Sequence, residues 1–571
     1  MKLRPIGLSF RVSFFDTSPR GGPVIKTRHY GRIALTLLGL AISVATTVAH
    51  AQTFSVLYNF ETNTGDPANP SYEGIVAQGP DGNLYSTAIA GGTNNYGAMF
   101  KITPGGTLTV PYSFDSAHGT PLSGLTLGTD GNFYGTTSSG GTSGLGTVFK
   151  ITPSGTVVVL HSFAGDDGIV PYAPPIQGTD GNFYGTTVEG GTNSLGTVYK
   201  ITPTGKFTTI YSFDGSHGYY PYAPVVQGTD GNFYGTTELG GANSYGVVFK
   251  ITASGKLTVI YNFDGTHGGQ SSSPLVQGSD GNFYGTTTSF GSKGGGVVFK
   301  ITATGKLTVL HNINGTTDGN EPFAGLVQAT DGNLYGTTNQ GGNSTNCSSG
   351  CGTIFRISPT KPYPYKVLYN FDGTTGQQPQ VTLLQHTNGI LYGDADIGGT
   401  MNAGTFYSLD LGLKPFVALV PTAGKVGKSI GILGQGFTGT KSVSFNGTAA
   451  KFKVSSDTYL TATVPNGATT GFVTVKTPGG TLASNKVFRV SPQIKLFNPT
   501  SGPVGTVVTI TGFSLTGATK VTFGGVKATT FSVDSDNQIT ATVPTGAKTG
   551  KIAVTTPGGT ATSKDVFTVT R

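Results

Sequence analysis

A repeat with a period near 50 residues runs through the middle of this 571-residue chain and limits the folds that it can adopt. The tripeptide Asp-Gly-Asn begins at Asp81, Asp130, Asp180, Asp230, Asp280 and Asp331, in steps of 49, 50, 50, 50 and 51 residues. A degenerate seventh copy, Asn388-Gly389-Ile390, follows 57 residues later. Such self-similarity indicates repeated units that pack on one another.

One unit divides into four short β-strands. Between Pro224 and Phe263, the segments 225–227, 232–237, 246–252 and 256–263 are rich in β-branched and aromatic residues, and turn residues separate them. Four strands in about 50 residues, repeated seven times, predict an all-β fold with a β-propeller. A β-solenoid is the rival architecture, but its coils usually have shorter periods and lack this four-strand order.

The two ends of the repeat region predict how the ring closes. The segment 53–60 matches the fourth strand of other units, such as 206–213, whereas the last unit, after 405–410, has no fourth strand of its own. An N-terminal strand that completes the last blade would remove the open sheet edges of the ring. We therefore expect seven blades.

The start of the chain has the features of a secretion signal. Arg28 and Arg32 precede an apolar run at 33–48, and Ala49-His50-Ala51 fits the small-x-small cleavage rule. We predict an N-terminal extension and signal peptide over 1–51, a secreted or cell-surface location, and no transmembrane anchor after cleavage. A membrane anchor is the alternative, but the apolar run is short for a membrane span.

The charge of the chain gives little reason to expect a nucleic-acid partner. The formal net charge of +8 comes largely from the predicted leader, because the chain after residue 51 holds 28 basic and 26 acidic residues. No clustered basic patch is visible in the sequence, so we expect no binding to nucleic acid.

The repeated unit resembles a known family. The pattern Gly-Thr-Asp-Gly-Asn-Phe-Tyr-Gly-Thr-Thr, then Gly-Gly and Gly-Thr-Val-Phe-Lys-Ile-Thr, resembles the bacterial GloVer tandem repeat over residues 53–410. This resemblance implies an exported protein, in some cases surface-anchored, with no common activity. The seventh copy departs most, since Gly393-Asp-Ala-Asp396 replaces Gly-Thr-Thr. A more distant similarity to the propeller of streptogramin lyases brings no clear match to their catalytic residues.

The C-terminal region is a tandem duplication. Leu460-Thr-Ala-Thr-Val-Pro465 matches Ile539-Thr-Ala-Thr-Val-Pro544, and Thr477-Pro-Gly-Gly-Thr481 matches Thr556-Pro-Gly-Gly-Thr560. Both copies resemble the IPT/TIG family of Ig-like domains. We therefore expect a seven-bladed propeller over 52–412, followed by Ig-like β-sandwiches over 413–490 and 491–571.

The loops where the copies differ carry the candidate ligand-binding residues. Equivalent loop positions hold His118, Asp167, His217, His267 and Asp318, which could converge on a metal or a polar substrate; drift within surface loops is the alternative. Tyr172, Tyr219, Tyr220 and Tyr222 could stack on sugars or pack on the next blade. We take His118, Asp167, His217, Tyr219, Tyr220, His267 and Asp318 as the candidate ligand-binding set.

Other motifs indicate structure rather than chemistry. Asp-Gly-Asn lacks the acidic closing residue of a calcium loop and suits a hairpin turn. Asp394 and Asp396 would share one face of a strand, as catalytic or metal-binding carboxylates can, but they lie in the most degenerate unit. Cys347 and Cys351 are expected to form a disulfide. We expect no catalytic residue, no metal site and no cofactor.

These observations favour an exported, non-enzymatic binding or scaffold protein. Its propeller loops would recognise an extracellular polysaccharide or a surface protein, and the Ig-like pair would act as a spacer or as a second binding site. The alternative is a secreted carbohydrate-active or lyase-type enzyme that uses the same loops.

Overall fold

The computed structural model describes residues 51–70 and 75–571. The predicted extension and signal peptide therefore lie outside the described residues, apart from Ala51, and the secreted location stays a prediction. All regular elements of the described chain are β-strands. In this part of the chain, no helix has the length and hydropathy needed to cross a membrane.

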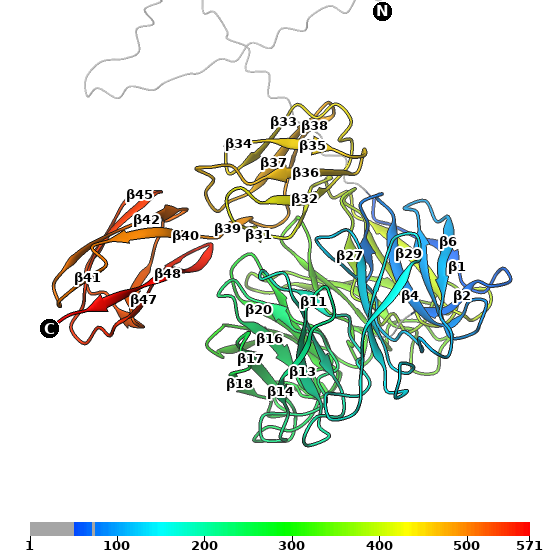
Figure 1. The fold of residues 1–571 in the computed structure, drawn as a ribbon. Helices are drawn as coiled ribbons and strands as arrows, with labels where there is room; N and C mark the ends of the chain where they lie inside the picture. The colour runs from blue at the N-terminus through cyan, green and yellow to red at the C-terminus, as the bar shows by residue number, and fades with distance from the viewer. Residues whose placement is uncertain (1–50, 71–74) are drawn as a thin grey trace, which may run out of the picture. The chain divides into compact units, whose positions relative to one another are not determined.

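Seven antiparallel sheets form the blades of a propeller, which confirms the predicted fold class (Figure 1). We number the blades I to VII along the chain. Blade I contains β2 (Pro67–Pro70), β3 (Ala77–Gln78), β4 (Leu84–Gly91), β5 (Ala98–Ile102) and β6 (Leu108–Ser113). Blade II contains β7 (Thr126–Leu127), β8 (Phe133–Thr137), β9 (Thr147–Ile151) and β10 (Val157–Ser162). Blade III contains β11 (Ile176–Gln177), β12 (Phe183–Thr187), β13 (Thr197–Ile201) and β14 (Phe207–Ser212), and blade IV contains β15 (Val226–Gln227), β16 (Phe233–Thr236), β17 (Val247–Ile251) and β18 (Leu257–Asn262).

The later blades repeat the same order, and blade VII takes its outer strand from the start of the chain. Blade V contains β19 (Val276–Gln277), β20 (Phe283–Thr287), β21 (Val297–Ile301) and β22 (Leu307–Asn312). Blade VI contains β23 (Val327–Gln328), β24 (Leu334–Thr338), β25 (Thr353–Ile357) and β26 (Tyr365–Asn370). Blade VII contains β27 (Leu384–Gln385), β28 (Leu391–Ala395), β29 (Thr405–Asp410) and β1 (Thr53–Asn59).

Pairing of β1 with β29 closes the ring. The two strands run antiparallel from Thr53 opposite Asp410 to Asn59 opposite Thr405, and Figure 1 shows them side by side. Their side chains pack further, since the ring of Phe54 lies 5.3 Å from that of Tyr407. The expectation that the first strand completes the last blade is thus met in the structure.

The recurring Asp and Tyr of each unit join a turn to the packing between blades. In blade IV, Asp230 accepts hydrogen bonds from the Asn232 backbone N–H at 3.1 Å, the Tyr234 hydroxyl at 2.8 Å and Lys250 Nζ at 2.8 Å. The Tyr234 ring is fully buried and stacks on Phe283 of the next blade, with centroids 4.1 Å apart. One Tyr therefore ties the turn of its own blade to the core of the next.

A second link between blades comes from the first strands, and we call it the Gln clasp. Gln227 of blade IV accepts a hydrogen bond at 2.9 Å from the backbone N–H of Thr179, which precedes the Asp-Gly-Asn turn of blade III. The same bond recurs at six of the seven boundaries, through Gln78, Gln177, Gln227, Gln277, Gln328 and Gln385. At the boundary between blades I and II, Leu127 replaces Gln, and Pro80 replaces the donor and has no N–H.

A third link, the Thr clasp, lies near the opposite ends of the strands. Thr186 of blade III donates a hydrogen bond at 3.0 Å to the Ala223 carbonyl in the segment that enters blade IV. Six boundaries carry this bond, donated by Thr87, Thr136, Thr186, Thr236, Thr286 and Thr337. At the boundary between blades VII and I the equivalent residue is Asp394.

The first C-terminal module is a small β-sandwich with its own core. Its buried residues include Ile432, Phe445 and Leu460, on strands from both sheets. Its strands are β30 (Ala418–Val420), β31 (Ala423–Gly424), β32 (Ser429–Leu433), β33 (Ser442–Phe445), β34 (Thr448–Ala450), β35 (Phe452–Val454), β36 (Tyr459–Thr463), β37 (Val473–Thr477), β38 (Gly480–Ala483) and β39 (Arg489–Val490).

The second module repeats this design with a separate core that contains Ile510, Phe523 and Phe567. Its strands are β40 (Gln493–Asn498), β41 (Ser501–Gly502), β42 (Val507–Phe513), β43 (Lys520–Phe523), β44 (Val526–Lys527), β45 (Phe531–Ser535), β46 (Gln538–Thr542), β47 (Gly550–Thr556) and β48 (Gly559–Val569). The alternation of buried and exposed residues along β46 is that of a half-buried strand.

The missing Gln clasp between blades I and II can be installed by two substitutions. In the double variant Pro80→Thr, Leu127→Gln, the new Thr N–H can donate to the new Gln, whereas each single variant leaves one of the two groups without its partner. We expect a coupling free energy of about 1 kcal/mol in favour of the double variant, measured by denaturant unfolding in a double-mutant cycle. Gln227→Leu, which removes an existing clasp, should lower stability by a similar amount. If the stability changes of the two single variants simply add up in the double variant, the clasp does not have this role.

Acid should weaken the turn network. Partial burial acts to raise the pKa of Asp280, but hydrogen bonds from Lys300, Asn282 and Tyr284 outweigh it and lower the pKa from 3.8 to about 2. The stability that the ionised carboxylate supplies is thus present above pH 3.8 and is lost as the pH falls through about 2. Asp280→Asn should lower the unfolding temperature at neutral pH, and this difference from the wild type should shrink as the pH falls through that window. A difference that is independent of pH would contradict the network.

Candidate functional site

The blades differ from one another mainly at one edge of the propeller, which we call the loop face. Because neighbouring strands in a blade are antiparallel, the loops between second and third strands share this edge with the segments that lead into the next blade. Isolated bridges join the two kinds of loop, as between Tyr219 and Leu239 and between Ile169 and Glu189. The Asp-Gly-Asn turns lie at the opposite edge.

A residue with a left-handed backbone stands at the same place in six of the entering segments. In blade IV it is Tyr220, with φ of 58°, and its N–H donates a hydrogen bond at 3.3 Å to the Leu195 carbonyl in the loop of the preceding blade. Its own carbonyl accepts a bond from the Glu238 N–H at 3.1 Å. The six residues are Asn69, Val170, Tyr220, Gln270, Glu321 and Gln378. The backbone of this position is fixed while its side chain varies, which suits a recognition surface on a rigid frame.

Four tyrosines gather on the loop face at blades III and IV, and we call them the tyrosine quartet. The ring centroids of Tyr172 and Tyr222 lie 5.1 Å apart, those of Tyr219 and Tyr220 lie 4.9 Å apart, and those of Tyr220 and Tyr222 lie 6.5 Å apart. All four side chains are partly exposed. The quartet therefore forms a continuous aromatic surface across two blades.

Polar side chains also lie in the loop segments of blades VI and VII. Asn339 Nδ2 donates to Glu321 Oε2 at 3.4 Å, and Gln380 Nε2 donates to Asn339 Oδ1 at 3.1 Å. Glu238, which follows the Gly-Thr-Thr of blade IV, is half-buried, and burial raises the pKa of its carboxyl. The loop face thus combines aromatic rings with partly exposed carboxylates such as Glu238 and Glu321, while the amides of Asn339 and Gln380 are buried.

Each predicted His or Asp residue forms a pair with a residue that is near it in the sequence. His118 Nδ1 lies 2.7 Å from Asp115, His217 Nδ1 lies 2.8 Å from Asp214, and His267 Nδ1 lies 2.7 Å from Asp264. Likewise Asp167 contacts His161 at 2.7 Å and Asp318 contacts His311 at 3.0 Å. Within the described chain no three His, Cys, Asp or Glu side chains come together as a metal site. These residues thus form separate local pairs and are not gathered as a metal site.

Only part of this surface could be predicted from the sequence. Tyr219 and Tyr220 of the candidate set do meet, and Tyr172 and Tyr222 complete the quartet. Glu238 and Asn339 were missed, although the signal was present: the residue after each Gly-Thr-Thr changes from blade to blade. Gln380, in the segment that enters blade VII, was missed as well. His217 instead borders a groove of about 540 Å³ with Ser216, Ala242, Thr258 and Asn262.

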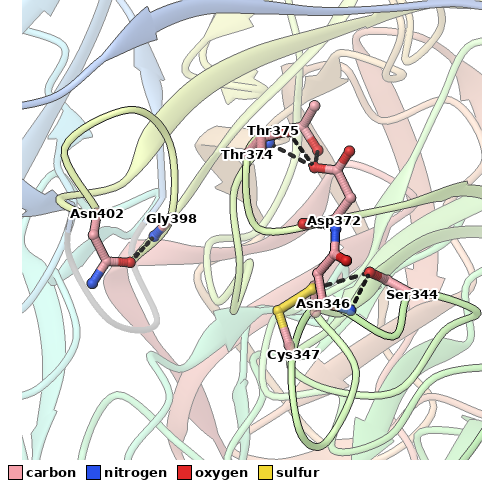
Figure 2. Close-up of a disulfide and its surroundings, with 9 residues drawn as sticks. Ser344, Asn346, Cys347, Asp372, Thr374, Thr375, Gly398 and Asn402 are labelled. Atoms are coloured by element: carbon pink, nitrogen blue, oxygen red, sulfur yellow. Dashed lines mark hydrogen bonds between the residues drawn. A yellow bond between two sulfur atoms is a disulfide. The ribbon is translucent and has the colours of Figure 1, made fainter.

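The two cysteines form a disulfide in the loop between β24 and β25 of blade VI. This loop is longer than its counterparts, since 15 residues separate the paired Thr338 and Thr353, against 10 between the equivalent Thr187 and Thr197. Figure 2 shows how the added segment is held: Asn346 Nδ2 donates at 2.9 Å to the Asp372 carbonyl, in the segment that enters blade VII. Asp372 Oδ1 in turn accepts hydrogen bonds from Thr374 and Thr375.

Loss of the disulfide should act locally. The double variant Cys347→Ser, Cys351→Ser removes a crosslink that closes a loop of only a few residues, so the expected cost to the unfolding free energy is at most about 2 kcal/mol. Limited proteolysis should show new cleavage between residues 343 and 350, while the wild type without reductant resists it. Cleavage elsewhere in the propeller, or a loss of cooperative unfolding, would contradict a local role.

Together the seven blades and the two C-terminal sandwiches define an all-β propeller protein with Ig-like domains. The sequence profile of the Gloeobacter/Verrucomicrobia repeat matches residues 43–229, 175–407 and 223–473, and the chain belongs to this repeat family. The IPT/TIG domain profile matches residues 492–569. The expectation of two IPT/TIG domains is thereby corrected to one, because the first sandwich shares the architecture but not the profile match.

Several solved structures are distantly similar to this chain. A fungal alcohol oxidase of the AA5 family in complex with copper is 15% identical over 75% of this chain and 100% of its own, with a TM-score of 0.41. SGBP-B from a xyloglucan utilization locus in Bacteroides uniformis is 22% identical over 27% of this chain, with a TM-score of 0.14. A surface glycan-binding protein from Prevotella bryantii is 21% identical over 26%, with a TM-score of 0.20. The chain spans 48% and 38% of the length of these two proteins. No curated protein is significantly similar in sequence.

Proposed function

We propose that this chain is an exported, non-enzymatic binding or scaffold protein whose loop face recognises glycans. The tyrosine quartet is the observation that supports this proposal. A tyrosine ring offers a flat apolar face to the C–H groups of a sugar, and its hydroxyl can hydrogen bond to a sugar oxygen. Two ring pairs at 4.9 and 5.1 Å span neighbouring blades, which suits a ligand made of several linked sugar rings.

A carboxylate of the same blade suits the hydroxyl groups of this ligand. Glu238, which lies in blade IV with three of the four tyrosines, is partly exposed and offers acceptor oxygens. Binding sites typically combine an aromatic surface with a few such polar groups. The His and Asp residues of the candidate set would contribute from the surrounding loops, with Asp214 and Asp264 orienting the rings of His217 and His267. The two sandwiches would act as a spacer or as a second binding site.

The charges of the loop face favour an uncharged glycan over an anionic one. Carboxylates occur in the loops of nearly every blade, whereas Lys293 is the one Lys or Arg among the described loop-face residues. An anionic polymer would lose affinity by repulsion from these carboxylates at low salt. The proposal therefore names neutral polysaccharides at the cell surface or in its surroundings as the ligand class.

A binding experiment tests the role of the quartet. The chain from residue 52 onward would be screened on a glycan array, with and without divalent metal, and its best neutral ligand measured by calorimetry. In the double variant Tyr172→Ala, Tyr222→Ala, the lost ring contacts should weaken binding by about tenfold or more. Tyr96→Ala is the matched control, because Tyr96 is an exposed tyrosine on a loop of blade I, away from the quartet.

Three results would contradict the proposal. Binding that the double variant leaves unchanged would show that the quartet is not the site. The absence of binding to any neutral glycan on the array would show that the ligand class is wrong. Turnover of a bound polysaccharide would show that the protein is an enzyme and not a scaffold.

A further inference from the structure

The boundary between blades VII and I differs from the other six at two facing positions. Asp394 stands where the other blades have the Thr of the Thr clasp, and Ser86 stands where they have the Gly that precedes this Thr. At these glycines a Cβ atom would press on an aromatic ring, as at Gly135, where it would lie 2.6 Å from Phe149. Asp394 therefore places a carboxylate where the other blades have a Thr hydroxyl. Ser86 places a hydroxyl where the other blades have a glycine next to an aromatic ring.

Strand register places both side chains in the same gap between the two blades. Asp394 is paired with Phe406 in blade VII, and Ser86 is paired with Phe100 in blade I, so each shares a sheet face with its partner. The rings of Phe100 and Phe406 meet edge to face across the boundary, with centroids 6.2 Å apart. Asp394 thus lies on the side of blade VII that faces blade I, and Ser86 lies on the side of blade I that faces blade VII.

The polar atoms in this gap are deeply buried. Ser86 is 0% exposed, Asp394 is 1% exposed, and Asp396, which directly follows the end of the same strand, is 4% exposed. Within residues 51–70 and 75–571, neither Ser86 Oγ nor Asp394 Oδ2 has a hydrogen-bond partner, so these two atoms do not bond to each other. Buried polar atoms in this state usually indicate a bound water or ion.

The charges around Asp394 favour an ion. Asp396 lies two residues further along the chain and is also buried, so this boundary holds two acidic side chains. The described hydrophobic side chains at this boundary include Phe60, Phe100 and Phe406. Among the described residues, no Lys, Arg or His forms an ion pair with Asp394. A water molecule could satisfy the hydrogen bonds but would leave the carboxylate charge uncompensated.

We propose that a hard cation of the Ca²⁺ type binds in the gap between blades VII and I, held by the carboxylate of Asp394 with Asp396 and the hydroxyl of Ser86. Hard cations take carboxylate, hydroxyl and backbone carbonyl oxygens and complete their shells with water. The ion replaces the Thr clasp that this boundary lacks. Since blade VII also holds β1, the site lies where the ring closes, and it makes the stability of the closed propeller dependent on the cation.

Thermal unfolding of the chain from residue 52 onward, stripped with EDTA at pH 7.5, tests the proposal directly. Millimolar Ca²⁺ should raise the unfolding temperature of the wild type by several degrees. Asp394→Thr, which restores the residue of the other blades, should abolish this response and should unfold in EDTA at a temperature no lower than the wild type. Asp166→Asn, at an exposed loop-face carboxylate, is the matched control and should keep the full response to Ca²⁺.

Direct binding measurements keep the test informative if Asp394→Thr does not fold. Equilibrium dialysis should find one tightly held Ca²⁺ per wild-type chain, and Ser86→Gly should weaken its binding severalfold without removing it. Tb³⁺ in place of Ca²⁺ should show luminescence sensitised by the buried Tyr392, which packs at the same boundary.

A wild type that neither binds Ca²⁺ nor is stabilised by it would overturn the proposal, as would an Asp394→Thr variant with an unchanged response. A loss of stability with rising pH that Ca²⁺ does not reverse would show instead a protonated Asp394.

Discussion

Closure of the ring by β1 and β29 is the interaction on which the rest of the propeller depends. Each blade buries its side chains against two neighbours, so an open ring would expose two faces and leave a row of unpaired backbone groups on β29. The pairing from Thr53 to Asn59 brings the first described strand and the last blade together. Residues more than 340 positions apart thus become partners, and every boundary between blades can then be filled.

The repeated sequence works because each of its fixed residues has more than one role. The Asp of the turn is bound by the Asn two residues later, by the Tyr hydroxyl and by a Lys on the third strand, while the same Tyr stacks on the next blade. Local turn chemistry and packing between blades therefore favour the same conformation, and this agreement is typical of sequences that specify one fold. The loop face carries no such double constraint, which leaves its side chains free to vary.

Much of the fold could be predicted from the sequence, because the period of the repeat and the turn residues are local signals. The expected strands at 225–227 and 246–252 correspond to Val226–Gln227 and Val247–Ile251, and the expected closure follows from the match between the first strand and the other fourth strands. The loop face was harder to predict. Equivalent positions in a repeat lie on a ring, but the sequence does not give the radius of that ring. In addition, Asp214 lies three residues before His217, and at this spacing the two side chains pair with each other. The quartet and Glu238 meet only through contacts between blades, which no single repeat encodes.

The two kinds of clasp are unevenly distributed around the ring, so some boundaries between blades are held by fewer hydrogen bonds than others. Counting only the described residues, blade I has one clasp on each side, because Leu127 and Pro80 remove the Gln clasp toward blade II and Asp394 removes the Thr clasp toward blade VII. Blades III to VI have two on each side. Fluctuations that separate neighbouring blades should therefore concentrate at blade I, where amide hydrogens would exchange sooner than in the middle of the ring. A nearly sevenfold sequence thus builds a ring whose first blade is the preferred place for it to open.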